Sequence, residues 1–140
     1  MANTNITYEI EGALDVGALS QTLTELCHEY EFIKTTFIKD GDCLYQEIHD
    51  DCFIELEKYD FSQEPDEHKQ HAIDALFEEL YKDKFNLETL PLGRFCLIQH
   101  SKDRFTLVIL MHHIIADAVI AQFLVEFISS KYNELASNKT

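Results

Sequence analysis

The chain has 140 residues, which is enough for one domain with a modest hydrophobic core. It carries 26 acidic and 11 basic residues, a formal charge of -15, and this negative field would repel a phosphate backbone and argues against nucleic acid as a partner. The longest largely apolar run, residues 105–111, is too short to cross a bilayer. We recognise no signal peptide at the start, so we expect a cytoplasmic domain without a membrane partner.

The first half of the chain predicts one strand, one helix and three further strands. Residues 6–10 alternate apolar and polar side chains, as a half-buried strand does. Asp15 stands at a helix N-cap position before apolar residues at helical spacing, which predicts a helix over residues 15–30. Strands are expected at 32–38, 43–49 and 52–59, and Gly41 favours a hairpin turn between the first two.

The second half predicts a helix, two strands and a final helix. Apolar residues share one face of a helix over residues 62–84, and a broad apolar stripe predicts another over 117–135. Strands are expected at 94–100 and 105–112, and the apolar character of the second is typical of a central strand buried on both faces. The order of elements predicts the α/β class, as a two-layer sandwich with helices packed on a mixed β-sheet.

The cysteines are not spaced as a zinc knuckle or a redox motif. Cys27 and Cys96 lie within apolar patterns, so we expect them to be small buried hydrophobic residues. The histidines outside residues 112 and 113 are scattered, and we expect them on the surface or hydrogen-bonded within the fold.

The residues with the clearest chemical potential follow the apolar strand. His112 and His113 stand at its carboxyl end, where open α/β sheets often bind ligands, and Asp117 follows four residues after His113. His113 could act as a general base with Asp117 orienting its surroundings. A metal site of His112, His113 and Asp117 is disfavoured, because adjacent strand residues point to opposite sides. A purely structural role, with Asp117 as a helix N-cap, is common for such residues. Spacing alone does not decide between these alternatives.

Residues 112–118, HHIIADA, resemble the HHxxxDG signature of the condensation domains of nonribosomal peptide synthetases. More distantly they are similar to the HxxxD signature of chloramphenicol acetyltransferase. Residues 12–19 resemble the family's G-x-L-D-x-x-x-L segment, and 31–37 resemble the end of its H-E-x-L-R-T-x-F segment, with Tyr30 at the His position. Residues 85–92 resemble its F-D-L-x-x-x-P-L segment. The resemblance implies a chloramphenicol acetyltransferase-like lobe.

The resemblance also implies roles for individual residues. His113 would be the catalytic residue in amide formation between a donor thioester and an aminoacyl thioester acceptor, and His112 would have a milder supporting role. Asp117 would be structural, paired with the residue at the family's Arg position, here Lys34. A Lys–Asp pair keeps the charge balance but loses the bidentate geometry of Arg. Ala118 replaces the signature's Gly, which we expect to narrow the site.

The resemblance covers residues 1–140 as the amino-terminal lobe of such a domain, and the family's opening S-x-A-Q-x-R-L-W segment and carboxy-terminal lobe do not occur in this sequence. The implied partners are acyl or peptidyl carrier proteins, whose phosphopantetheine arms hold the substrates, and the missing lobe. No cofactor is expected to bind directly. One lobe alone leaves the cleft open, so we expect little activity from it and self-association through the exposed face. Two alternatives remain: a non-catalytic module that binds carrier proteins or a partner lobe, and an epimerising or other acyltransferase relative.

Overall fold

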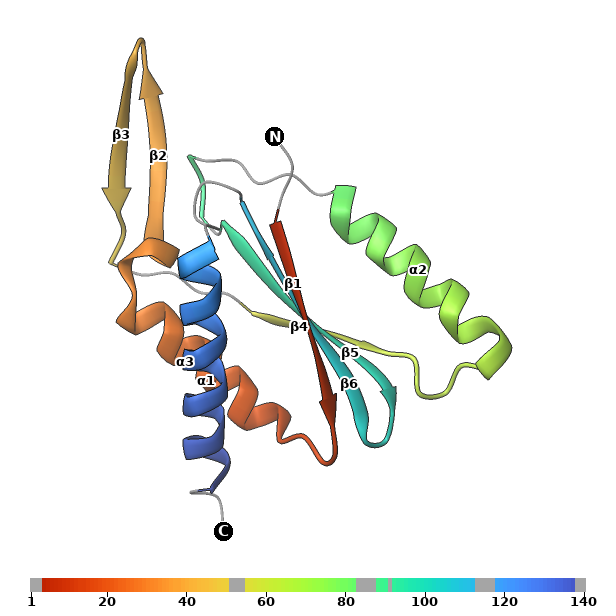
Figure 1. Cartoon of the computed structure of the whole chain (residues 1–140). Helices are drawn as coiled ribbons and strands as arrows, with labels where there is room; N and C mark the ends of the chain where they lie inside the picture. The colour runs from red at the N-terminus through yellow and green to blue at the C-terminus, as the bar shows by residue number, and fades with distance from the viewer. Residues whose placement is uncertain (1–3, 51–54, 83–87, 91, 113–117, 138–140) are drawn as a thin grey trace.

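The computed structural model describes residues 4–50, 55–82, 88–90, 92–112 and 118–137. These residues form three α-helices, a short 3-10 helix and six strands (Figure 1). In chain order they are β1 (Thr4–Glu11), α1 (Val16–Glu29), η1 (Glu31–Lys34), β2 (Thr35–Asp40), β3 (Cys43–Ile48), β4 (Leu56–Asp60), α2 (Asp66–Lys82), β5 (Gly93–Ser101), β6 (Arg104–Met111) and α3 (Ala118–Ser137). No helix in these described ranges is long and apolar enough to cross a membrane.

The main sheet has four strands in the order β1-β6-β5-β4. β6 pairs antiparallel with β1 on one side and with β5 on the other, while β4 pairs parallel with β5. The sheet is therefore mixed, as the sequence predicted. Strands that are adjacent in sequence, β5 and β6, form a hairpin, whereas β4 reaches its parallel neighbour through α2.

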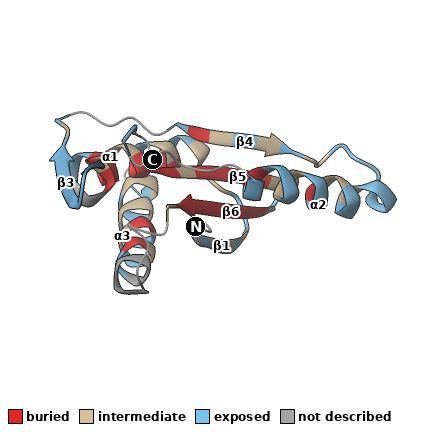
Figure 2. Cartoon of the chain, turned by 90° about the horizontal axis from the view of Figure 1, so that it is seen from above, coloured by how far each residue is buried: buried red, intermediate tan, exposed pale blue. Residues whose placement is uncertain are grey.

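β6 is the buried central strand that its apolar sequence predicted. Every residue from Phe105 to Met111 is buried. Because side chains alternate along a strand, Leu107 and Ile109 enter one hydrophobic cluster, while Val108 and Leu110 enter a second. The strand thus has a core on each of its faces, and Figure 2 shows it as buried along most of its length.

Helices cover both faces of the sheet, and this corrects the predicted number of layers. The first cluster joins β6 to α1 and α3, and the second joins it to α2 through Ile73 and Leu80. Figure 1 shows α1 and α3 on one side of the sheet and α2 on the other. The α/β class with helices on a mixed sheet is confirmed, but the lobe has three layers and not two. An amphipathic pattern shows that a helix has a buried face, but it does not tell which side of the sheet receives that face.

The start of α1 is capped as predicted. Asp15 Oδ1 accepts a hydrogen bond of 3.0 Å from the backbone N–H of Ala18. The Asp15 N–H donates in turn to the hydroxyl of Tyr132 on α3, also at 3.0 Å. Leu19, Leu23 and other residues of α1 are buried, so this helix is held both to the sheet and to α3.

The segment after α1 differs from the prediction. A strand was expected at 32–38, but residues 31–34 form the turn η1, and β2 runs from Thr35 to Asp40. β2 and β3 form a separate two-stranded sheet, joined by the predicted turn at Gly41, which has φ 62°. Every residue of β3 is exposed, so the strand predicted at residues 43–49 is present but lies outside the main sheet. Of the strand expected at 52–59, β4 covers Leu56 onward, and residues 51–54 lie outside the described part.

The bounds of the last two helices also differ slightly from expectation. α2 begins at Asp66 and not near residue 62, because Pro65 directly before it fits the first turn and its carbonyl accepts from Lys69 N–H at 3.0 Å. α3 begins at Ala118 and continues to Ser137, two residues beyond the predicted end at residue 135.

Candidate active site

The carboxyl end of β6 is fixed by its pairing with the start of β5. The backbone N–H of His112 donates to the carbonyl of Leu92 at 2.9 Å, which continues the β5–β6 pairing beyond Gly93 and Met111. A Cβ added at Gly93 would lie 3.3 Å from the carbonyl oxygen of Leu110, so glycine permits the close approach of the two strands here. His112 is half-buried in this frame. The position from which the motif starts is therefore well defined.

The two residues predicted to carry the chemistry, His113 and Asp117, lie outside the described residues. Ala118 is the first residue of α3, and its side chain is likewise not described. The general-base, metal and structural alternatives for the motif therefore stay predictions. Among the residues that the structure describes, no group of three or more His, Cys, Asp or Glu side chains is placed to hold a metal ion.

The described elements on both sides of residues 113–117 are anchored in the core. β6 ends in its two hydrophobic clusters, and α3 is held through the buried Leu124 and Ile128. Tyr30, at the C-cap of α1, packs edge-on against Phe123 and Phe127 of α3, with ring centroids 4.9 and 5.2 Å apart. Sequence reasoning noted Tyr30 only as a departure from the family's His, and it missed this contact. The structure makes Tyr30 a bridge between α1 and the helix that follows the motif.

Lys34, the predicted partner of Asp117, is the last residue of η1. Its Nζ lies 3.5 Å from the backbone carbonyl oxygen of His28, in the last turn of α1, where a cation is favourable. The backbone carbonyl of Lys34 accepts from the N–H of His49 at 2.9 Å, next to the β2–β3 hairpin. The Lys34–Asp117 pair itself stays a prediction.

An ion pair that the sequence did not reveal lies near the start of β5. Arg94 Nε donates to Glu57 Oε2 at 2.8 Å and its Nη2 donates to Oε1, so a bidentate ion pair joins β5 to β4. The hydrogen bonds from Arg94 hold the pKa of Glu57 below its ordinary value in spite of partial burial. Burial, followed by the nearby Glu57 charge, raises the pKa of the Cys96 thiol to about 12. Cys96 is therefore a packing residue and not a nucleophile, as expected for it and for the buried Cys27.

Comparison with known proteins decides the family. The sequence model described as "Condensation domain" matches residues 1–140. The chain belongs to the condensation-domain family. This agrees with the resemblance of the HHIIADA segment and of the three flanking segments.

The curated relatives of this condensation-domain chain are large synthetases. It is 30% identical over 131 residues to a linear gramicidin synthase of Brevibacillus parabrevis, covering 94% of this chain and 2% of that protein. It is 32% identical over 125 residues to surfactin synthase subunit 1 of Bacillus subtilis (strain 168), covering 89% of this chain and 3% of the relative.

Solved condensation domains have the same fold as this chain. The starter condensation domain of rhizomide synthetase RzmA superimposes with a TM-score of 0.86 at 22% identity, over 99% of this chain and 33% of that structure. A condensation domain involved in chain release from the enacyloxin polyketide synthase superimposes with a TM-score of 0.73 at 17% identity, over 93% of this chain and 25% of that structure. The chain thus spans about a third of the rhizomide synthetase domain. These likenesses confirm the predicted lobe of the chloramphenicol acetyltransferase-like fold.

Proposed function

We propose that this chain works as the amino-terminal lobe of an amide-forming condensation domain, with His113 as its catalytic residue. The observation that supports the proposal is the HHIIADA segment directly after the buried central strand, in a chain of the condensation-domain family. A rigid strand end is a suitable support for a catalytic side chain, because catalysis depends on exact placement of the reacting groups.

The proposed reaction joins two substrates that carrier proteins present on phosphopantetheine arms. The α-amino nitrogen of the acceptor aminoacyl thioester attacks the thioester carbonyl carbon of the donor acyl or peptidyl group. A C–N bond forms and the C–S bond breaks, which leaves a free thiol on the donor's carrier. His113 takes the proton released from the nitrogen and returns it to the departing sulfur, so the step needs no other reactant.

The neighbouring residues have supporting roles in this proposal. Asp117 has a structural role and pairs with Lys34. His112, whose backbone is bound to Leu92, orients the segment that follows it. Ala118 adds a methyl group at the signature's Gly position and narrows the approach to the site.

The complete cleft needs a second lobe, in keeping with the third of the rhizomide synthetase domain that this chain spans. Without it, the reacting groups are neither oriented nor shielded from water. We therefore expect the chain alone to form little amide, and we propose that carrier proteins and the second lobe are its functional partners.

The test uses the full-length protein that carries this chain, with donor and acceptor carriers loaded and the product measured by mass spectrometry. His113→Ala should lower the rate of amide formation by about 10²- to 10⁴-fold, the usual contribution of a general acid–base group. His112→Ala should lower the rate of amide formation less than His113→Ala does. His71→Ala, on the exposed surface of α2, is the matched histidine control and should leave the rate unchanged. An unchanged rate in His113→Ala would refute the catalytic role.

A second candidate function is a non-catalytic module that binds carrier proteins or a partner lobe. Lys34 at the family's Arg position and Ala118 at its Gly position favour it, since both depart from the catalytic signature. In that case, His113→Ala would leave product formation unchanged, and the protein would still bind loaded carriers. The epimerising or other acyltransferase alternative would instead give a different product from the same loaded carriers, with the same dependence on His113.

A further inference from the structure

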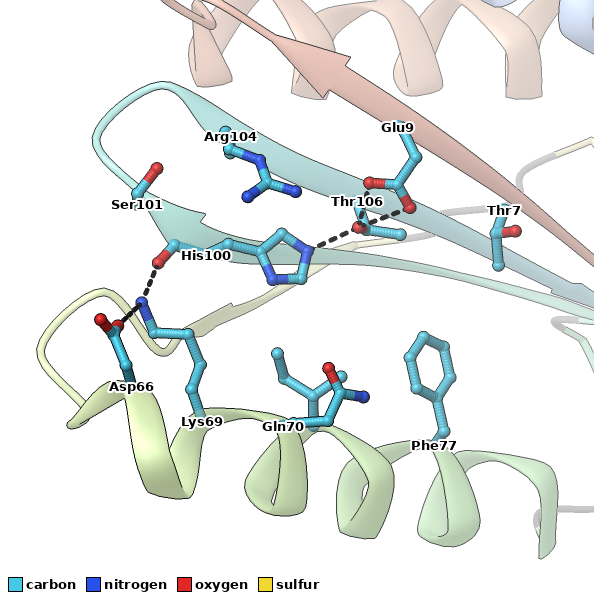
Figure 3. A pocket seen from close by; sticks show the side chains of 11 residues that line it. Thr7, Glu9, Asp66, Lys69, Gln70, Phe77, His100, Ser101, Arg104 and Thr106 are labelled. Atoms are coloured by element: carbon cyan, nitrogen blue, oxygen red, sulfur yellow. Dashed lines mark hydrogen bonds and ion pairs between the residues drawn. The ribbon is translucent and has the colours of Figure 1, made fainter.

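A polar crevice lies between α2 and the main sheet, away from the HHIIADA segment. It has a volume of about 590 Å³, within the range of ligand pockets, and side chains from β1, α2, β5 and β6 line it (Figure 3). We call it the α2 crevice. Arg104, at its edge, is the first residue of β6, whereas His112 directly follows the last. The lining reaches along the sheet to Thr7, which pairs with Val108, roughly 13 Å before His112 at about 3.3 Å per residue, and none of the lining residues belongs to the HHIIADA segment.

A chain of hydrogen bonds on the sheet side of the crevice makes Nε2 of His100 a donor. The buried Thr106 hydroxyl lies 3.1 Å from each carboxylate oxygen of Glu9 and 2.6 Å from His100 Nε2. A hydroxyl has one proton, and a carboxylate can only accept, so Thr106 donates to Glu9 and His100 Nε2 donates to Thr106. The other ring nitrogen of His100 faces the space between the sheet and α2 (Figure 3).

Most of the polar groups in the α2 crevice are already paired. Lys69 Nζ donates to the carbonyl of His100 at 2.8 Å and lies 3.5 Å from an oxygen of Asp66. Gln70 donates to Asp74 on its own helix. These groups form the walls of the crevice, and the charge of Lys69 is compensated by that of Asp66.

Two exposed charges at the sheet side, those of Glu9 and Arg104, form no ion pair within the described residues. Within the part of the chain that the structure describes, the Arg104 guanidinium has no hydrogen bond or ion pair, and the carboxylate of Glu9 is bound only by the neutral Thr106 hydroxyl. In the β1–β6 register Glu9 pairs with Thr106, and Glu11 pairs with Arg104, which lies two residues before Thr106. The two side chains therefore present one cation and one anion on the same face of the sheet (Figure 3).

Beyond Asp66, Lys69 and Gln70, the helix side of the α2 crevice becomes apolar. Ile73 and Phe77 of α2 line it, and both belong to the hydrophobic cluster on this face of the sheet. Figure 3 shows the Phe77 ring directed from α2 toward the sheet. A ligand that fits here needs an apolar part beside its charged groups.

We propose that the α2 crevice binds a free α-amino acid with an apolar side chain. The ligand's carboxylate meets the guanidinium of Arg104, its ammonium meets the carboxylate of Glu9, and its side chain lies on Phe77. A simple anion would be repelled by Glu9, and a simple cation by Arg104, so the zwitterion fits the pair of charges best. This binding site is independent of amide formation at His113.

The test is isothermal titration calorimetry of the full chain with L-leucine and three matched probes. N-acetyl-L-leucine lacks the ammonium, L-leucinamide lacks the carboxylate, and glycine lacks the side chain. L-leucine should bind with a saturable isotherm, and each matched probe should bind at least about tenfold more weakly, because each loses one charge-assisted contact or the apolar contact.

Variants separate this proposal from a general effect of charge. Arg104→Gln and Glu9→Gln should each weaken L-leucine binding at least about tenfold. Lys102→Gln and Glu29→Gln make the same charge changes at exposed positions that do not line the crevice, and should bind L-leucine normally. Equal binding of L-leucine and N-acetyl-L-leucine would show that the site does not recognise the ammonium group and would overturn the proposed zwitterionic ligand. Absence of saturable L-leucine binding up to about 50 mM would overturn the site.

Discussion

The bidentate pair between Glu57 and Arg94 should stabilise the attachment of the edge strand β4. β4 is the edge strand next to β5 in the described sheet, and this ion pair crosses the contact between them. Tyr59 adds a hydrogen bond of 2.9 Å to the same carboxylate. The side chains of Arg94 and Glu57 are 23% and 30% exposed, which places the pair between the surface and buried cases.

The expected magnitude follows from this intermediate burial. Exposed pairs contribute about 0–1 kcal/mol, whereas removing one partner of a buried pair costs about 3–5 kcal/mol. For Arg94→Met we expect a loss of about 2 kcal/mol, because a half-buried carboxylate is left without its cation. Glu57→Gln should cost less, since the amide still accepts a hydrogen bond. After discounting for solvent screening, the coupling energy of the pair should be about 1.5 kcal/mol.

A double-mutant cycle measured by urea unfolding at pH 7 tests these values. The cycle compares the original chain, Arg94→Met, Glu57→Gln and the double variant. Lys82→Met is the control, because its ion pair with Glu79 is 3.9 Å long and mostly exposed. We expect the control to cost less than about 0.5 kcal/mol. A coupling energy below about 0.3 kcal/mol for Glu57 and Arg94 would show that the pair does not hold β4 in solution.

The pH dependence provides a second check on the same pair. The pKa of Glu57 is lowered from 4.5, first by the hydrogen bonds from Arg94. A depressed carboxyl pKa contributes stability that is complete above the unfolded-state value and is lost as the pH falls through the folded-state value. The coupling energy should therefore be full at pH 7 and decline only below 4.5. An equal coupling energy after the carboxyl group is fully protonated would refute the electrostatic explanation.

Three further predictions concern single side chains. The Tyr8 hydroxyl is buried without a hydrogen-bond partner among the described residues, so Tyr8→Phe should keep or raise the free energy of unfolding. Tyr132→Phe should instead lower it by about 1 kcal/mol, because it removes the acceptor for the Asp15 N–H. Urea unfolding measures both values. Burial, and then the Arg104 and Lys69 charges, lower the pKa of His100 from 6.5 against the opposing effect of Glu9. The contribution of His100 to stability is therefore complete above pH 6.5 and is lost as the pH falls. His100→Gln should flatten the decline of the unfolding free energy below pH 6.5. The isolated chain should self-associate through the exposed apolar side chains of the β2–β3 hairpin, and Leu44→Lys should reduce this in sedimentation velocity, while an unchanged association constant would exclude the hairpin face.

Local patterns sufficed for the elements whose signals lie within a few residues. Asp15 before an apolar helix pattern predicted the start of α1, and Gly41 predicted the hairpin turn. The apolar run of β6 predicted a strand buried on both faces. In each case the residues that determine the element are neighbours in sequence, so their chemistry is visible without knowledge of the fold.

Features that depend on long-range packing could not be predicted in this way. The face of the sheet that α2 covers depends on the path of the chain between β4 and β5, not on the amphipathic pattern of α2. The ion pair of Glu57 and Arg94 joins residues that are distant in sequence, and nothing local marks either as a partner. The same holds for Tyr30, whose contact with Phe123 depends on how α1 and α3 cross.

The candidate active site combines both kinds of information. The two histidines were found as polar residues after an apolar strand, and the resemblance to condensation domains gave them different roles. The structure adds that the strand end is held by the His112–Leu92 hydrogen bond and that α3 is held by Tyr30. Both supports act on the ends of the segment and not on its centre. We therefore propose that Tyr30 is a positioning residue in the proposed mechanism, and expect its substitution to lower the rate of amide formation less than His113→Ala does, since no reacting group is removed.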